Sequence, residues 1–332
     1  MKRFLLYIAA IACCYSCTKE EFQTVDILLN GYMGDDLSYQ EQVSRGVKCV
    51  VINKYSAVEK FGKQEKQLER SIVANYDKEG KIINLNHDNN YYSEYEYICY
   101  DNGKIKRIVK NHLDSARTEI TYKFVKEFDE DGNLIKEIGY NKNGIPDSPI
   151  RVHQYDKKRL IETTYLIDRT WDGKYKKEIH KTNYMYNDKG WLIEEKSYDN
   201  ESIYEMYTHK YDKKGNRIET INYDEDGEIN SKIVYEYRDG GDTFIRTDYD
   251  GDGNMTSKSE TTPDEYIIYD NDRNVVDRGI IEDKRLVERT SGNNIWRIEY
   301  DKKGHCVKVA RYHSYQGKET IQAITECEYT YY

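Results

Sequence analysis

A short motif that recurs along most of the chain constrains its fold more than any other feature. An aromatic residue is followed by Asp or Asn, and a Gly comes two or three positions later. The clearest copies begin at Tyr76, Tyr100, Phe128, Tyr186, Tyr211 and Tyr300, and degenerate copies begin at Tyr155 and Tyr269. With Tyr237 counted between Tyr211 and Tyr269, successive copies lie 24 to 32 residues apart. A recurring period marks a repeat architecture, so we expect one supersecondary unit repeated many times.

The residues within each period indicate strands and tight turns. Asp-Gly and Asn-Gly pairs supply the positive-φ positions of hairpin turns, so we expect positive φ at Gly215 and Gly304. Runs such as Arg217–Tyr223 are rich in β-branched and aromatic residues, which favour strands. No long apolar pattern has a helical period, and helix should stay below about 10%. The sequence therefore predicts an all-β, repetitive antiparallel β-meander or hairpin array.

The tyrosine content indicates how such an array can fold without a thick core. The chain has 34 tyrosines, 33% charged residues and a mean hydropathy of −0.94. The last two values alone would favour disorder, but tyrosine buries a large ring while keeping a wettable hydroxyl. In Tyr91–Tyr100, aromatic residues occupy both faces of the expected strand. We therefore expect a strongly twisted sheet that coils on itself, with tyrosine rings on both sides.

The units that read Tyr-Asp-x-x-Gly-Asn, as in Tyr211–Asn216, resemble the YD repeats of Rhs-type and teneurin-like proteins. The resemblance covers roughly residues 70 to 332. It implies a spiralling β-sheet, which in that family can close into a shell around a toxin domain. The chain departs from the family in having only eight or nine expected hairpins and in ending on a strand, Glu328–Tyr332. It is more similar to short YD-repeat surface lipoproteins of unknown function from Gram-negative bacteria.

The first expected hairpin, from Val47 to Asp77, is atypical. Its long connection, Ala57–Lys63, includes Phe61 and Gly62 between lysines. We expect a helical turn in this connection.

The N-terminus has the parts of a bacterial lipoprotein signal. Lys2 and Arg3 precede an apolar segment, Phe4–Ala12, which is too short to span a bilayer and fits a cleaved signal peptide. A small residue followed by Cys at its end resembles a lipobox. Cys17, after Ser16, is our choice for the lipidated residue, because the polar run begins just after it; Cys13, after Ala12, is the alternative.

These features predict a signal peptide over 1–16, a polar tether over 17–45 and a β domain over 46–332. Cleavage would fall between Ser16 and Cys17, and acyl chains on Cys17 would hold the protein in outer-membrane lipid. Lys19–Glu21 resembles a short tag that directs lipoproteins to the exterior face; an ordinary linker is the alternative. The formal net charge of −9 makes a nucleic acid partner unfavourable.

No motif indicates catalysis, a cofactor or a metal centre. The P-loop, dinucleotide and G-x-S-x-G patterns are absent. Asp248, Asp250 and Asp252 match the first half of a calcium loop, but its twelfth position is Ser259 instead of Glu. An ordinary Asp- and Gly-rich hairpin turn is the favoured explanation of this stretch, and calcium binding is left open as the alternative. We therefore predict a protein that is not an enzyme and has no cofactor.

Two cysteines are predicted to meet on the last hairpin. For a two-residue turn at Gln316-Gly317, constant register places Cys306 opposite Cys327, at a separation that permits a disulfide. One β-bulge would shift this register. Whether Cys49 and Cys99 pair is left open.

Two functions fit a chain of this kind. The first is a surface binding module whose aromatic side chains contact a glycan or a protein. The second is a structural or assembly component whose open sheet edges pair with another chain. A ligand groove would favour the first, and two long unprotected terminal strands would favour the second.

Overall fold

The computed structural model describes residues 46–60, 63–87, 91–146, 149–171 and 174–332. These residues contain twenty-two β-strands and one 3₁₀ helix, η1 (Asp239–Gly241). Neighbouring strands pair antiparallel in both compact units of the chain, as between β1 and β2 or β12 and β13. The prediction of an all-β antiparallel fold with almost no helix is confirmed. Among the described residues, no helix has the length and apolar character of a membrane span.

The chain forms two compact units. Unit 1 combines the described residues before Tyr91 with Tyr237–Ile245 and Ser257–Tyr332, and unit 2 contains Tyr91–Glu236 and Arg246–Thr256. Unit 1 holds β1 (Val47–Lys60), β2 (Lys63–Tyr76), β3 (Ile82–His87), β17 (Glu265–Asp270), β18 (Val275–Glu282), β19 (Arg285–Ser291), β20 (Asn294–Tyr300), β21 (Cys306–Tyr315) and β22 (Lys318–Tyr331).

Unit 2 holds β4 (Tyr91–Cys99), β5 (Ile105–Leu113), β6 (Ile120–Phe128), β7 (Leu134–Asn141), β8 (Ile150–Asp156), β9 (Arg159–Trp171), β10 (Lys174–Tyr186), β11 (Leu192–Asp199), β12 (Ser202–Tyr211) and β13 (Arg217–Tyr223). The divisions between the units fall within β14 (Ile229–Arg238), β15 (Thr243–Asp250) and β16 (Met255–Thr261). Val109, Val125 and Ile138 are buried on adjacent strands and form a core cluster of this unit.

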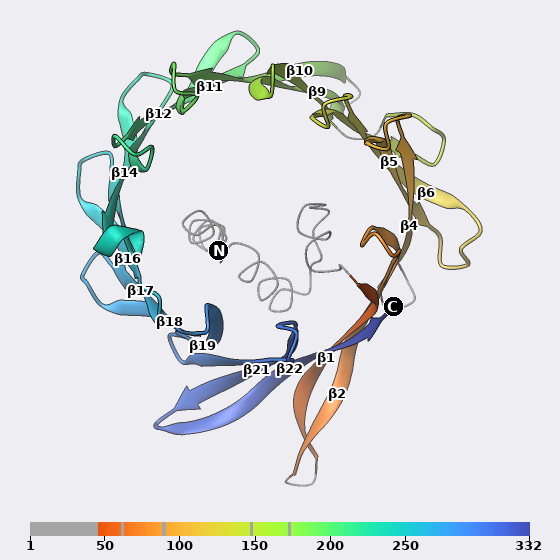
Figure 1. Ribbon diagram of the computed structural model, residues 1–332, viewed down its shortest axis with the longest axis vertical. Helices are drawn as coiled ribbons and strands as arrows, with labels where there is room; N and C mark the ends of the chain where they lie inside the picture. Colours follow the sequence, from red (N-terminus) through yellow and green to blue (C-terminus); the bar gives the residue numbers. More distant parts are fainter. Residues whose placement is uncertain (1–45, 61–62, 88–90, 147–148, 172–173) are drawn as a thin grey trace. The chain divides into compact units, whose positions relative to one another are not determined.

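In unit 1 the first and last strands of the sheet pair with each other. The pairing of β1 with β22 runs from Val47 opposite Tyr331 to Ser56 opposite Ala323. β1 therefore lies between β2 and β22, as the orange and blue ribbons show (Figure 1). Along these paired residues both sides of β1 are hydrogen-bonded, and neither terminal strand presents an open edge there. The sequence did not predict this pairing.

The first hairpin exists, but the predicted helical turn in its connection is wrong. β1 continues to Lys60 and β2 begins at Lys63. The ladder continues through the expected connection, where Ala57 lies opposite Lys66 and Val58 opposite Glu65. Extending the ladder satisfies the backbone groups of these residues, and a single helical turn would leave most of them without partners.

Many of the hairpin turns share one pattern, shown here at Asp212. The Gly215 N–H donates to the Asp212 carbonyl at 3.2 Å, and the Asp212 N–H donates to the Asn216 carbonyl at 2.9 Å. The Asp212 carboxylate accepts from the Lys214 and Asn216 N–H groups at 2.8 and 2.9 Å. Gly215 has φ of 93° and Gly304 has φ of 92°, which confirms the predicted positive-φ positions.

The tyrosine before five of the turns has a structural role that the sequence pattern does not reveal. Its hydroxyl donates to a main-chain carbonyl of a neighbouring hairpin. Such bonds join Tyr100 to Phe128, Tyr155 to Leu134, Tyr186 to Leu160, Tyr211 to Leu192 and Tyr300 to Leu286, at 2.7–3.0 Å. The ring therefore packs between hairpins while its polar end is satisfied. Successive repeats are linked in this way within each unit.

The turn carboxylates predict a loss of stability in acid. Hydrogen bonds from the Asn274 side chain and backbone hold the pKa of Asp270 below its usual value. Because the folded pKa is the lower one, the stability is present above the unfolded value of about 3.9 and is lost as pH falls through the folded pKa. We expect the urea denaturation midpoint to decrease as the pH is lowered below about 4. Asp270→Asn should weaken this dependence of stability on pH.

The control is Asp272→Asn in the same turn, because the Asp272 side chain makes no hydrogen bond among the described residues. Urea denaturation at a series of pH values, read by circular dichroism, measures the effect. An identical pH dependence in both variants would show that the Asp270 turn does not contribute.

Candidate ligand-binding site

Two β-bulges lie at the same level of the sheet in unit 1. In the pair β1/β2, Lys54 lies opposite Arg70 but Tyr55 lies opposite Leu68, so Glu69 has no partner in the ladder. Bulges turn side chains away from the regular alternation of a strand and are frequent beside binding sites.

The second bulge is in the pair β21/β22. Arg311 lies opposite Ala323 and Tyr312 opposite Ile321, which leaves Gln322 without a ladder partner. The pairing of β1 with β22 places Ser56 opposite Ala323. This contact between the terminal strands therefore brings the two bulges next to each other.

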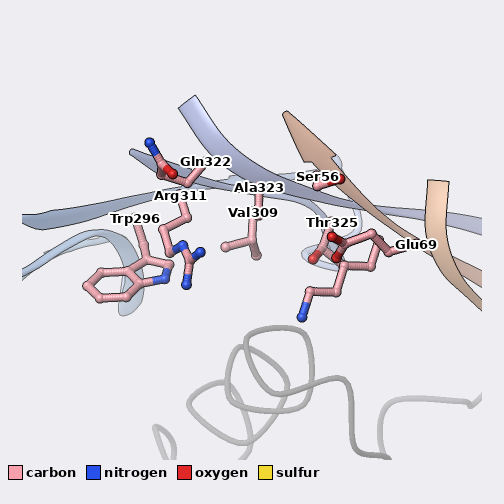
Figure 2. Close-up of a pocket in the computed structure, with 9 residues that line it drawn as sticks. Ser56, Glu69, Trp296, Val309, Arg311, Gln322, Ala323 and Thr325 are labelled. Atoms are coloured by element: carbon pink, nitrogen blue, oxygen red, sulfur yellow. The ribbon is translucent and has the colours of Figure 1, made fainter. Parts of the chain in front are cut away.

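A pocket of about 130 Å³ lies at the two bulges. Its lining follows from the strand register, since residues directly opposite each other share a face of the sheet. One row across β20, β21, β22 and β1 consists of Trp296, Arg311, Ala323 and Ser56, and the next consists of Val309, Thr325 and Lys54. The bulged residues Glu69 and Gln322 complete the lining. Trp296, Arg311 and Val309 project to the same side of the sheet, whereas Gln322 points away from them (Figure 2).

Trp296 is held in place by a buried polar network. The Arg289 guanidinium carbon lies 5.2 Å from the centre of the Trp296 ring. Arg289 donates to the buried Asp277 carboxylate from Nε at 3.0 Å and from Nη2 at 2.6 Å. Tyr266 donates to the same carboxylate at 2.9 Å. Burial raises the pKa of Tyr266, and the Asp277 charge raises it further, so the hydroxyl remains a donor and the network is fully occupied.

The charged groups of the pocket differ from this network in having no ionic partner. Lys54, Glu69 and Arg311 form no ion pair with any described residue. The neighbouring Arg297, in contrast, contacts Glu288 at 3.0 Å and Glu319 at 2.8 Å. The pocket therefore presents two cations and one carboxylate beside an indole ring, with Val309 and Ala323 as apolar lining. This arrangement can accept a polar ligand that has one apolar face.

The predicted cysteine contact is tested in part by the register of the last hairpin. Gln316 and Gly317 form the turn, with Tyr315 opposite Lys318. The register then shifts at Gln322, so the assumption of constant register is wrong. The described β21–β22 pairs end at Lys308 opposite Glu326.

Cys306 lies opposite Tyr300 of β20, and Cys327 lies opposite Ile52 of β1. Both thiols are buried and free. Burial raises the pKa of Cys306 to about 12 and also raises the pKa of Cys327, to which the Cys306 thiol contributes. A disulfide between them stays a prediction.

The other predicted sites are distributed as follows. Ser16 and Cys17, with the signal peptide and tether, lie outside the described residues. Cys49 and Cys99 are free thiols. At the calcium-like loop, Asp248 is ion-paired with Arg246 at 2.7 Å, and Asp250 accepts from the Asn254 N–H at 2.8 Å as in the other turns. Within the described chain, no three His, Cys, Asp or Glu side chains are grouped to hold a metal ion.

Sequence reasoning missed Trp296 and Arg311. It singled out tyrosines because of their number, and Trp296 occurs in an ordinary strand sequence, Asn294–Tyr300. Only the strand register shows that Trp296 and Arg311 lie opposite each other. The one available signal was the rarity of tryptophan, with three residues in the chain.

Comparison with known proteins finds weak structural similarity. No family model and no curated protein matches the chain. TcdB2-TccC3-TEV has 14% identity and a TM-score of 0.35, over 79% of this chain but 15% of that one. A porin-like protein from Bacteroides uniformis ATCC 8492 has 10% identity and a TM-score of 0.31, over 87% of this chain and 98% of that one. These values are too low to support an argument about function.

Proposed function

We propose that this chain is a lipid-anchored surface protein that binds a glycan in the pocket at Trp296. The observation that supports it is the pocket at the two adjacent bulges, which is lined by an indole ring and by charged side chains that have no ionic partner among the described residues. Aromatic rings stack on the apolar face of a sugar, and the polar groups at its edge bind hydroxyls. The β1–β22 pairing closes the terminal edges on which the assembly alternative depends.

The size of the pocket favours a single sugar ring. Its volume is about 130 Å³. Pockets for drug-sized ligands usually measure about 300–1,000 Å³. A terminal or branching sugar of a longer glycan, inserted alone, fits these dimensions better than a large ligand.

The test uses the full chain, purified in detergent, on an array of cell-surface and envelope glycans. We expect wild-type protein to bind a subset of glycans and Trp296→Ala to lose about tenfold or more in affinity, since stacking on an aromatic ring contributes on the order of 1–2 kcal/mol. Trp191→Ala in unit 2 is the control for loss of a tryptophan. Absence of any binding, or equal binding by all three proteins, would exclude this function for the pocket.

The repeat assignment and the membrane anchor belong to the same proposal. Turns such as Asp212–Asn216 and the tyrosine bonds between hairpins support a YD-type repeat. The anchor rests on the signal sequence and on Cys17, and the Lys19–Glu21 tag supports placement on the exterior of the outer membrane.

The anchor predicts acylation of Cys17. Metabolic labelling with an alkyne fatty acid should label the wild-type chain, because several acyl chains at about 0.8 kcal/mol per buried methylene hold a protein on the membrane. Cys17→Ser should be unlabelled and should leave the membrane fraction. Cys13→Ser is the matched control and should label normally; the reverse pattern would make Cys13 the lipidated residue.

A further inference from the structure

We infer that the sugar bound at Trp296 carries a carboxylate, and that Arg311 is the residue that binds this group. The inference rests on the proposed glycan binding and specifies its substrate class. A uronic acid is the simplest sugar of this kind, since it keeps the pyranose ring and replaces the terminal hydroxymethyl with a carboxylate.

The Arg311 side chain is free to bind an anionic ligand. Arg311 is exposed in the pocket and forms no ion pair among the described residues. Nearby arginines in unit 1 are occupied: Arg278 contacts Glu265 at 2.6 Å, and Arg289 contacts Asp277 at 2.6 Å. The chain as a whole has nine more formal negative than positive charges. Arg311 is therefore available to bind an anion.

Arg311 also lies next to the indole ring. Trp296 and Arg311 lie directly opposite each other on β20 and β21, and such pairs have Cβ atoms about 5 Å apart. A pyranose stacked on Trp296 would therefore place a substituent at its edge within reach of Arg311. The planar guanidinium binds a carboxylate with two parallel hydrogen bonds, a geometry that a hydroxyl cannot match.

The other end of the pocket has a different charge distribution. Lys54 and the bulged Glu69 lie there, on β1 and β2. Glu69 lies three strands from Arg311, about 14 Å at roughly 4.8 Å per strand, which is beyond the reach of one sugar ring. The bound carboxylate is therefore expected at Arg311 rather than beside Glu69, where like charges would repel.

The experiment compares sugars that differ only at the terminal carbon. Methyl β-D-glucuronide and methyl β-D-galacturonide are titrated against methyl β-D-glucoside and methyl β-D-galactoside. Saturation-transfer NMR and the indole ¹⁵N shift of Trp296 report binding to the full chain in detergent. We expect at least one acidic glycoside to bind about tenfold more tightly than its neutral partner. Arg311→Gln should remove this preference, and the exposed Arg107→Gln in unit 2 should keep it.

The outcomes separate this inference from the proposed function. Equal binding of acidic and neutral glycosides, lost in Trp296→Ala, would overturn the carboxylate assignment and leave glycan binding intact. Preference for a sulfated glycoside over the uronide would also overturn it, since the bound anion would then be a sulfate. If no glycoside and no glycan of the array binds, the proposed function itself fails. Arg311→Lys should bind the uronide with intermediate affinity, because it keeps the charge without the planar fork.

Discussion

Gly279→Ala is expected to destabilise unit 1 by about 3 kcal/mol or more. Gly279 is an interior residue of β18, where a side chain would normally be tolerated. An added Cβ would lie 2.1 Å from the Tyr266 ring and 2.6 Å from a methyl group of Leu286. Tyr266 and Leu286 are buried, so neither can move aside into solvent.

Displacement of Tyr266 has a consequence beyond packing. Its hydroxyl donates to Asp277, which also binds Arg289 beneath Trp296. Loss of a hydrogen bond to a buried charged group costs about 1.5–3 kcal/mol. We therefore expect Gly279→Ala to lower the urea denaturation midpoint and to weaken glycan binding at Trp296 together.

A double-mutant cycle distinguishes this steric mechanism from a general sensitivity of β18 to substitution. In a Tyr266→Leu background the ring is absent, and Gly279→Ala should cost less than half of what it costs in the wild type. A cost that is unchanged in this background would mean that the Tyr266 contact is not the cause. Val276→Ala, on the same strand at an exposed position, should change stability by no more than about 0.5 kcal/mol.

The features that sequence analysis predicted correctly are those that depend on neighbouring residues. Asp212, Gly215 and Asn216 form their turn within a few residues, so their chemistry can be recognised locally. The hairpin period and the near absence of helix follow from the same local patterns. These features define the repeat, which is most of the fold.

The candidate site could not be predicted because it depends on register between distant strands. Glu69 and Gln322 are separated by most of the chain, and they become neighbours only through the β1–β22 pairing. A bulge has no reliable residue signature in a single sequence, since one extra residue in a ladder can occur at many positions. The same bulge at Gln322 invalidated the arithmetic that placed Cys306 opposite Cys327.

The turn glycines offer the second large effect, with a matched control in the same unit. Gly215→Ala should destabilise unit 2 by about 2 kcal/mol or more, from two sources. An L-residue at the positive φ of Gly215 is strained by about 1 kcal/mol. The new Cβ would also lie 2.9 Å from the Trp191 ring, which packs at 5.4 Å, centre to centre, against Tyr211.

Gly227→Ala is the control, because Gly227 has φ of 80° and no atom within 4 Å of an added Cβ. It has the backbone strain without the collision, so it should cost only about 1 kcal/mol. Urea denaturation measures the difference, and Trp191 fluorescence should change in Gly215→Ala alone. Equal costs would mean that the turn needs glycine for its backbone conformation only; a larger cost at Gly215 would show that the Asp212 turn is also a surface on which the preceding hairpin packs through Trp191.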